Sequence, residues 1–240
     1  MEHPIATPPT QRPPEWHVEV VQETGSTNAD LLAAAAAGAP DRSVLVARHQ
    51  TAGRGRLDRR WEAPAGANLL VSLLFTRVPE HPHELTQRVA LAAAAACERL
   101  AGMRPELKWP NDLLVDGAKL AGVLAQSADT VRGRVVVVGI GINVGWAPEG
   151  AARVGDDIDP FDLLAAMLHA YDALPADIWP TYRQRLATLG RSVRVELPDG
   201  ELLGRALDVE RDGRLVVLDD CGISHRFTTG DVVHLRPTGD

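Results

Sequence analysis

Residues 43–75 read SVLVARHQTAGRGRLDRRWEAPAGANLLVSLLF, and much of the fold and function follows from them. The two apolar runs Ser43–Ala47 and Asn68–Phe75 are typical of strands. Between them, Gly53–Trp61 places four arginines and a tryptophan in a chain whose formal net charge is −7. We therefore predict two strands connected by a glycine-jointed loop that binds an anion, and we call Gly53–Trp61 the arginine loop.

The composition is that of an ordinary soluble globular protein, with 45% hydrophobic and 24% charged residues. No apolar run reaches the roughly 18 residues of a membrane span, and the proline-rich residues 1–14 predict a flexible tail without a signal-peptide core. We expect a cytoplasmic protein. The acidic balance argues against nucleic-acid binding, because a phosphate backbone is normally met by an extended basic surface. Cys97 and Cys221 match no metal or redox spacing and are expected to stay reduced.

The chain up to residue 189 predicts strands and helices in alternation. The expected strands, besides the two above, are Trp16–Gln22, a short strand from Leu107, Lys119–Ser127 and Val131–Val144. The expected helices follow Ser26–Asn28 up to Gly38, and cover His83–Ala101, Pro160–Leu174 and Ala176–Leu189. Because the long second helix carries its large apolar residues on one side, we expect it to pack on a sheet.

After Gly190 the pattern changes to short strands separated by turn sequences. The expected strands are Ser192–Leu197, Leu202–Val209, Arg214–Leu218, Ile223–Thr228 and Val232–Leu235. Five short strands in a segment of this length predict a small barrel.

The arginine loop is the first candidate site. Its two glycines let the backbone approach a ligand closely, and the guanidinium groups of Arg54 and Arg56 suit phosphate or carboxylate. Gln50 enters the loop with a neutral hydrogen-bonding group. Trp61 offers a flat face to a heterocycle, although a tryptophan at this position is equally suited to anchoring the loop to the core.

The second candidate site is Lys108–Asp112 together with Lys119. A lysine that opens the apolar run Lys119–Leu124 either finds a partner at the strand end or extends to solvent. Gly122 within this run predicts the close approach of a ligand or of another backbone.

Two further motifs carry polar groups at the ends of predicted elements. Gly139 and Gly141 alternate on one face of a strand and leave a trough without side chains, which Asn143 continues with an amide; a β-bulge or tight sheet packing is the alternative. The motif lacks the third glycine of a dinucleotide-binding fingerprint. Ser26–Asn28 supply caps to the helix that follows, and a helix N-terminus also suits an anionic or ureido ligand.

Together and in this order, these motifs resemble those of the biotin protein ligases, also called biotin–acetyl-CoA-carboxylase ligases. The resemblance covers about residues 16–240. The matching residues are Ser26, Thr27, Asn28, Gln50, Gly53, Arg54, Gly55, Arg56, Trp61, Lys108–Asp112, Lys119–Gly122, Gly139, Gly141 and Asn143. The resemblance implies an α+β fold, in which residues 15–189 form a mixed central β-sheet flanked by helices and residues 190–240 form an SH3-like barrel.

The resemblance also implies a reaction in two steps. Biotin and ATP give biotinyl-5′-AMP and pyrophosphate, and biotin then passes to one lysine of a biotin carboxyl carrier domain. Mg²⁺ would be held largely by the triphosphate, without a dedicated protein site. The expected hydrogen-bonding partners of biotin are Ser26, Thr27, Asn28 and Gln50.

The remaining matched residues are expected around the reacting groups. Arg54–Arg56 would form a loop over biotin and the adenylate, and Lys119 would contact the reacting carboxylate and phosphate. Asp112 would position the incoming lysine or the metal-nucleotide, and Trp61 would stack near the adenine. The glycines 53, 122, 139 and 141, with Asn143, would line the same site.

Two departures from the family pattern limit the resemblance. Many relatives carry a second glycine in the arginine loop where this chain has Asp58, so loop closure is expected to differ. Residues 1–14 are too short for the helix-turn-helix of the repressor branch, so we expect an enzyme that does not regulate transcription, as a monomer or weak homodimer. The alternatives are a lipoate or octanoate ligase or transferase of the same fold, and a non-catalytic module that binds nucleic acid or a protein.

Overall fold

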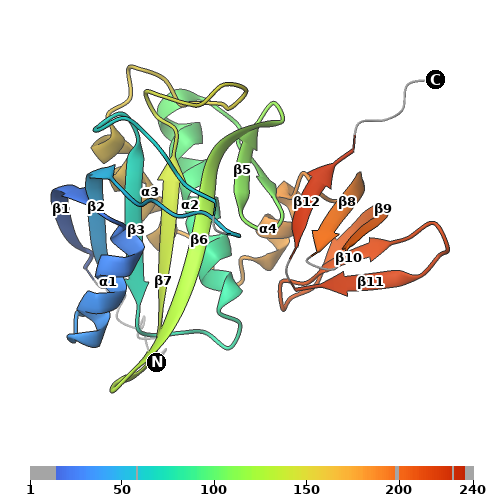
Figure 1. Ribbon diagram of the computed structural model, residues 1–240, viewed down its shortest axis with the longest axis horizontal. Coiled ribbons are helices and arrows are strands. Elements are labelled where there is room, and N and C mark those ends of the chain that lie inside the picture. Colours follow the sequence, from blue (N-terminus) through green and yellow to red (C-terminus); the bar gives the residue numbers. More distant parts are fainter. Residues whose placement is uncertain (1–14, 58, 198–199, 229, 236–240) are drawn as a thin grey trace, which may run out of the picture.

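The computed structural model describes residues 15–57, 59–197, 200–228 and 230–235, which form two sheets with four helices (Figure 1). The first sheet has seven strands in the order β1-β2-β3-β7-β6-β5-β4; β1 and β2 are parallel, and all other neighbours are antiparallel. Its strands are β1 (His17–Thr24), β2 (Ser43–Gln50), β3 (Leu69–Phe75), β4 (Glu106–Lys108), β5 (Asp112–Val115), β6 (Ala118–Thr130) and β7 (Gly133–Ile142). The predicted mixed sheet is confirmed.

The helices cover the two faces of this sheet unequally. Helix α1 (Thr27–Ala36) packs on one face through Leu31 and Ala35, against buried residues of β2, β3 and β7. On the other face lie α2 (His83–Ala101) and α3 (Pro160–Asp172), which share the main apolar core with β3, β6 and β7. The short α4 (Trp179–Arg185) leads out of this layer. The face that carries α1 is therefore left open beyond the helix N-terminus, and the teal arginine loop crosses it (Figure 1).

The observed bounds differ from the predicted ones at a few turns. Helix α2 has the predicted bounds and ends at Gly102, whose φ of 65° is left-handed. The turn between β6 and β7 lies at residues 131–132 instead of 128–130. There the Thr130 hydroxyl donates to Gly133 O at 2.8 Å and accepts from Arg132 N at 3.1 Å. This local side-chain bonding holds a turn that apolar periodicity does not reveal.

The second sheet follows α4 and contains five antiparallel strands in the order β11-β10-β9-β8-β12. They are β8 (Ser192–Leu197), β9 (Gly200–Val209), β10 (Leu215–Leu218), β11 (Ser224–Phe227) and β12 (Asp231–His234). All five predicted strands are present. Their pairing leaves β11 and β12 at opposite edges over the residues that the structure describes, so the predicted barrel is an open sheet there.

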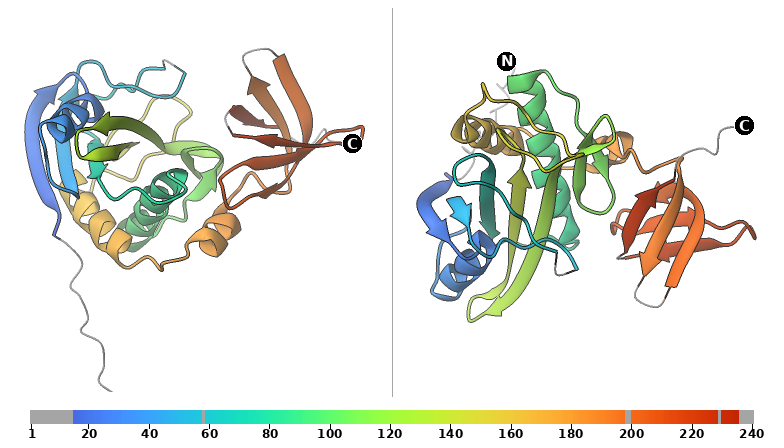
Figure 2. Two further views of the ribbon diagram at one scale, coloured as in Figure 1. Left: turned by 90° about the horizontal axis from the view of Figure 1, so that it is seen from below. Right: turned by 45° about the horizontal axis from the view of Figure 1, so that its top comes forward.

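Trp109 is one of the residues that connect the two sheets. It is 2% exposed; its indole N–H donates to Gly213 O, and its backbone N–H donates to Thr188 Oγ1, both at 3.0 Å. The apolar core continues from here into Val193 and Val232 of the second sheet. Figure 2 shows that sheet beside the first unit, at the end where β4 and β5 lie. None of the helices in the described ranges has the length and apolarity of a membrane span.

Candidate functional site

One cavity of about 470 Å³ lies where the arginine loop crosses the open face of the first sheet. It is bounded by the N-terminus of α1, by β6 and β7, and by the loop itself. Among its lining residues are Ser26, Thr27, Asn28, Gln50, Arg54, Gly55, Arg56, Trp61, Asp112, Lys119, Gly122, Gly139, Gly141 and Asn143. The four motifs that the sequence analysis singled out therefore meet in a single cavity.

One end of the cavity is polar and closely hydrogen-bonded. Gln50, the last residue of β2, accepts with Oε1 from the backbone N–H of Thr27 at 2.8 Å, and the Thr27 hydroxyl oxygen lies 3.1 Å from the same atom. Thr27 and Asn28 are buried although they begin a helix. Over the described residues, the Ser26 side chain makes no capping hydrogen bond, so the predicted capping role is wrong for it. These groups face the sheet and the cavity instead of the helix end.

Asn28 fits over the first glycine of the trough. A side-chain carbon at Gly139 would overlap the Asn28 amide, so the glycine makes room for it. The amide nitrogen of Asn28 donates to Leu124 O at 3.1 Å and to Gln126 Oε1 at 2.9 Å. Its oxygen lies 2.6 Å from the Ser72 hydroxyl. The trough reading of Gly139 therefore holds, and a protein side chain occupies this part of it.

Trp61 fills the next part of the trough. A side-chain carbon at Gly141 would overlap the indole ring, and one at Gly122 would lie 3.2 Å from Trp61 Cζ3. Gly122 and Gly141 are partners in neighbouring strands, so together they form a flat seat for the ring. The ring anchors the loop on the sheet, as one of the two interpretations predicted, and it lines the cavity; its contact with a heterocycle stays a prediction.

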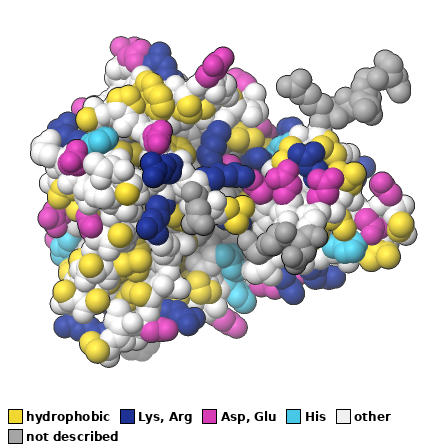
Figure 3. Space-filling model, viewed as in Figure 1, with side chains coloured by type: hydrophobic (Ala, Val, Ile, Leu, Met, Phe, Trp, Pro, Cys, Tyr) yellow, Lys and Arg dark blue, Asp and Glu magenta, His cyan; other side chains and the backbone are white. Residues whose placement is uncertain are grey.

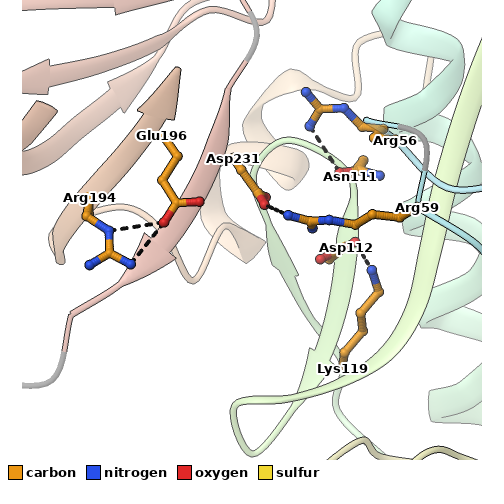
Figure 4. A network of polar contacts seen from close by, with 8 residues as sticks. All are labelled: Arg56, Arg59, Asn111, Asp112, Lys119, Arg194, Glu196 and Asp231. Carbon is orange, nitrogen blue, oxygen red and sulfur yellow. Dashed lines mark hydrogen bonds and ion pairs between the residues drawn. The ribbon is translucent and has the colours of Figure 1, made fainter. Parts of the chain in front are cut away.

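The other end of the cavity carries charge (Figure 4). The ammonium group of Lys119 lies 2.7 Å from Asp112 Oδ1 and 5.7 Å from the centre of the Trp61 ring. Arg56 donates to Asn111 Oδ1 at 3.3 Å. Burial lowers the pKa of the Arg56 guanidinium, and the nearby carboxylates of Asp231 and Asp112 oppose that shift. A partly buried arginine and a lysine at one end of a cavity favour an anionic ligand.

The arginine loop is folded back on itself. Arg54 and Arg60 form an antiparallel bridge, and the Trp61 backbone N–H donates to Gly53 O at 3.0 Å. A side-chain carbon at Gly53 would overlap the Trp61 carbonyl oxygen, which explains the glycine at this position. Asp58 lies outside the described residues.

The loop also contacts the second sheet. Arg59 donates to Asp231, the first residue of β12, and Asp231 lines the cavity. Figure 3 shows lysine and arginine side chains gathered at the centre of this face, with acidic side chains of the second sheet beside them. The positive surface is thus local, as the acidic composition of the chain requires.

Some polar residues at or next to this site were not singled out from the sequence, among them Ser72, Gln126 and Asp231. Ser72 left a signal, since it is the one polar residue of the apolar strand β3. Asp231 and Gln126 left none, because their contacts join distant parts of the chain. Asn143 lines the cavity, but its amide is bonded to Lys119 O and Ala152 O and lies 3.4 Å from the Asn68 amide. It holds the surrounding loops together. Over the described residues, His, Cys, Asp and Glu form no group suited to a metal ion.

Comparison with known proteins gives consistent matches. The profile of the biotin/lipoate A/B protein ligase family matches residues 20–143, and that of the biotin protein ligase C-terminal domain matches residues 188–235. The chain is 40% identical to a biotin–[acetyl-CoA-carboxylase] ligase of Mycobacterium tuberculosis, over 91% of this chain and 89% of that protein. It is 30% identical to the bifunctional ligase/repressor of Bacillus subtilis, over 79% of this chain and 66% of that protein.

The fold leads to the same family. The biotin protein ligase of Aquifex aeolicus, in complex with biotin and ATP, superposes with a TM-score of 0.74 at 25% sequence identity, over 92% of this chain and 99% of that chain. The profiles cover both sheets, and the sequence matches extend over most of the chain. On these grounds the chain belongs to the biotin protein ligases of the biotin/lipoate A/B protein ligase family.

Proposed function

We propose that this chain is an ATP-dependent biotin protein ligase. It forms biotinyl-5′-AMP and pyrophosphate from biotin and ATP, and then transfers biotin to one lysine of a biotin carboxyl carrier domain. The observation that supports this proposal best is the polarity of the cavity, which has neutral hydrogen-bonding groups at one end and cations at the other. Gly139 and Gly141, which mark the two ends, are two residues and therefore about 7 Å apart along β7.

The neutral end suits the ureido ring of biotin. This ring carries two N–H donors and one carbonyl acceptor, and Thr27, Gln50 and Ser26 offer matching groups. The dithiolane ring of lipoate has neither an N–H nor a carbonyl group. It would leave the buried amide and hydroxyl groups without partners, at a cost in affinity. The geometry therefore favours biotin over lipoate.

The cationic end suits the first reaction step. A carboxylate oxygen of biotin attacks the α-phosphorus of ATP, and pyrophosphate leaves. Because this brings two anions together, fixed positive charge lowers the barrier. Lys119 supplies positive charge from the sheet, and Arg54 and Arg56 supply it from the loop. Mg²⁺, held largely by the triphosphate, would neutralise further charge there.

The second step requires that the mixed anhydride survives until the carrier lysine arrives. The arginine loop would cover it and exclude water. The carrier amine then attacks the acyl carbon, and AMP leaves. We assign to Asp112 the orientation of the incoming amine or the metal-nucleotide, and its ion pair with Lys119 supports this assignment. We assign these steps to residues 15–189 as the catalytic domain, with residues 190–240 as a second domain.

Biotin-dependent exchange between ATP and pyrophosphate tests the proposal, with lipoate as the competing substrate. We expect exchange with biotin, little with lipoate, and a loss of at least about a hundredfold in Lys119→Ala. Thermal unfolding of the variant with biotin alone provides the control for folding and for binding at the neutral end. Exchange with lipoate but not biotin would overturn the assignment of the substrate, and full exchange in Lys119→Ala would overturn the role of the lysine.

A further inference from the structure

We propose that Ser72 and Gln126 are positioning residues that fix the direction of the hydrogen bonds at the neutral end of the cavity, so that it accepts an N–H group of the ligand. This inference rests on the proposed function for the identity of the ligand. Ser72, on β3, is 0% exposed, and Gln126, on β6, is partly buried. Both contact Asn28, which lines the cavity, whereas Ser72 and Gln126 are not among the lining residues.

The direction of the hydrogen bonds is set at a backbone carbonyl. Leu124 O, 3.1 Å from the Asn28 amide, can only accept a hydrogen bond. The Asn28 NH₂ group must therefore face Leu124, and Gln126 Oε1 accepts its second hydrogen at 2.9 Å. If the Asn28 amide were flipped, its oxygen Oδ1 would face Leu124 O, and two acceptors would meet without a hydrogen between them. The carbonyl oxygen of Asn28 is consequently directed at Ser72.

Ser72 passes this direction on to Thr27. Its hydroxyl oxygen lies 2.6 Å from Asn28 Oδ1 and 2.7 Å from Thr27 Oγ1, but it has one hydrogen. Asn28 Oδ1 has no hydrogen to give, so Ser72 must donate to Asn28. The short contact with Thr27 is then a hydrogen bond in which the Thr27 hydroxyl donates to Ser72.

The consequence is a pair of acceptors at the cavity wall. With its hydrogen directed at Ser72, Thr27 Oγ1 presents lone pairs 3.1 Å from Gln50 Oε1, which already accepts the Thr27 backbone N–H. Two acceptor oxygens at this distance repel each other unless a donor lies between them. A ureido N–H is such a donor. Because Gln50 Oε1 faces Thr27, the NH₂ group of Gln50 points away from Thr27 and can donate to a carbonyl group of the ligand.

The strands bring these partners together by register. Gly139 of β7 pairs with Ser72 on one side and with Leu124 on the other. Because Gly139 has no side chain, the Asn28 amide can lie between its two neighbours. We call the series of hydrogen bonds that runs from Leu124 O through Asn28 and Ser72 to Thr27 the relay. It spans β6, β7 and β3, and Gln126 accepts the second hydrogen of the Asn28 amide.

Three variants and two isomeric substrate analogues test the proposal by ATP–pyrophosphate exchange. The variants are Ser72→Ala, which breaks the relay, Gln126→Leu, which removes its outer acceptor, and Gln126→Glu, which keeps an acceptor of the same size. The analogues are the two cyclic carbamates of biotin, in which a ring oxygen replaces one ureido N–H. Each of the two isomers is compared with biotin.

We expect Ser72→Ala to raise the KM for biotin about tenfold and Gln126→Leu a few-fold, with the KM for ATP within about twofold of wild type. Gln126→Glu should match wild type. Wild type should prefer biotin over at least one carbamate by about tenfold to a hundredfold, and this preference should shrink in Ser72→Ala and in Gln126→Leu. A merely structural defect would raise the KM for biotin and the KM for the carbamate by the same factor.

An unchanged preference in both Ser72→Ala and Gln126→Leu, or a parallel rise in the KM for ATP, would refute the relay. Since Gln126 is partly exposed, Gln126→Leu keeps the test valid if Ser72→Ala does not fold. Wild-type protein that shows no exchange with biotin would instead refute the proposed function, and the relay with it.

Discussion

Arg59 of the arginine loop donates a hydrogen bond to Asp231 of β12, across 172 residues of sequence. The Arg59 side chain is 61% exposed, so this ion pair contributes little to global stability. Its effect is local, because it joins the loop that covers the cavity to the second sheet (Figure 4). A weak contact of this kind can open for substrate and close again at low cost.

Loss of the Asp231 carboxylate should loosen the arginine loop. We expect trypsin to cut after the loop arginines about threefold to tenfold faster in Asp231→Asn than in wild type, because opening of the loop becomes easier. Asp220→Asn, at an exposed position in the turn between β10 and β11, serves as the matched control and should behave as wild type. Equal cleavage rates in Asp231→Asn and wild type would show that the ion pair does not hold the loop.

Substitutions at different glycines of the trough should affect the binding of ATP and of biotin differently. In Gly141→Ala the new methyl group overlaps the Trp61 ring, whereas in Gly122→Ala it lies 3.2 Å from that ring. We expect Gly141→Ala to raise the KM for ATP by about tenfold or more, and Gly122→Ala by much less. Gly139→Ala overlaps Asn28 and should raise the KM for biotin. Steady-state kinetics of pyrophosphate exchange measure both constants; the opposite assignment would mean that the trough binds its ligands in the reverse order.

The stability of the fold should fall in mild acid through His234. Burial, with smaller contributions from Lys108 and Arg191, lowers the pKa of His234 to about 4. The ordinary pKa is about 6.5, so between pH 6.5 and 4 the unfolded chain binds the extra proton. The free energy of unfolding therefore decreases as the pH falls through this window, and this group has no effect above it.

Urea unfolding of His234→Gln and wild type at pH 7 and pH 4.5 measures this contribution. After allowance for the partial exposure of the ring, the decrease in wild type should exceed that of the variant by about 1–2 kcal/mol. Identical pH dependence of the two proteins would assign the acid sensitivity to other groups. His83 adds to it in the same direction, because burial lowers its pKa too.

The two thiols should differ sharply in reactivity. Burial raises the pKa of Cys97 to about 12, whereas Cys221 is exposed. Because the thiolate is the reactive form, we expect a thiol reagent to label only Cys221 in the folded protein, and both Cys97 and Cys221 in urea. Cys221→Ser should abolish the labelling of the folded protein. Labelling that persists in this variant would show that the core around α2 opens readily.

Residues with local signals were predicted well from the sequence. The apolar run of β3, the bounds of α2 and the turns of the second sheet depend on neighbours in the chain, so periodicity and turn residues reveal them. The clustering of the arginine loop with Lys119, Gly141 and Thr27 was implied by the family resemblance, and the structure brings these residues to one cavity.

What escaped prediction depends on contacts across the fold. Capping was expected of Ser26, but the groups of this segment meet Gln50 and Ser72, which only the packing of α1 on the sheet brings near. Likewise, nothing near residue 231 in the sequence indicates a cavity. The open pairing of the second sheet also depends on how strands far apart in sequence find each other.

Trp109 has a consequence for how this chain can be divided. Its two N–H groups are bound by Thr188 and Gly213, while Asn111 and Asp112, which follow it directly after Pro110, line the cavity. The segment Trp109–Asp112 therefore both contacts the second sheet and carries Asp112 at the cationic end of the cavity. A protein cut near residue 190 would keep Thr188 but lose Gly213, the partner of the Trp109 indole N–H. A second sheet taken from another protein would therefore have to supply an acceptor for the Trp109 indole N–H, as Gly213 O does here.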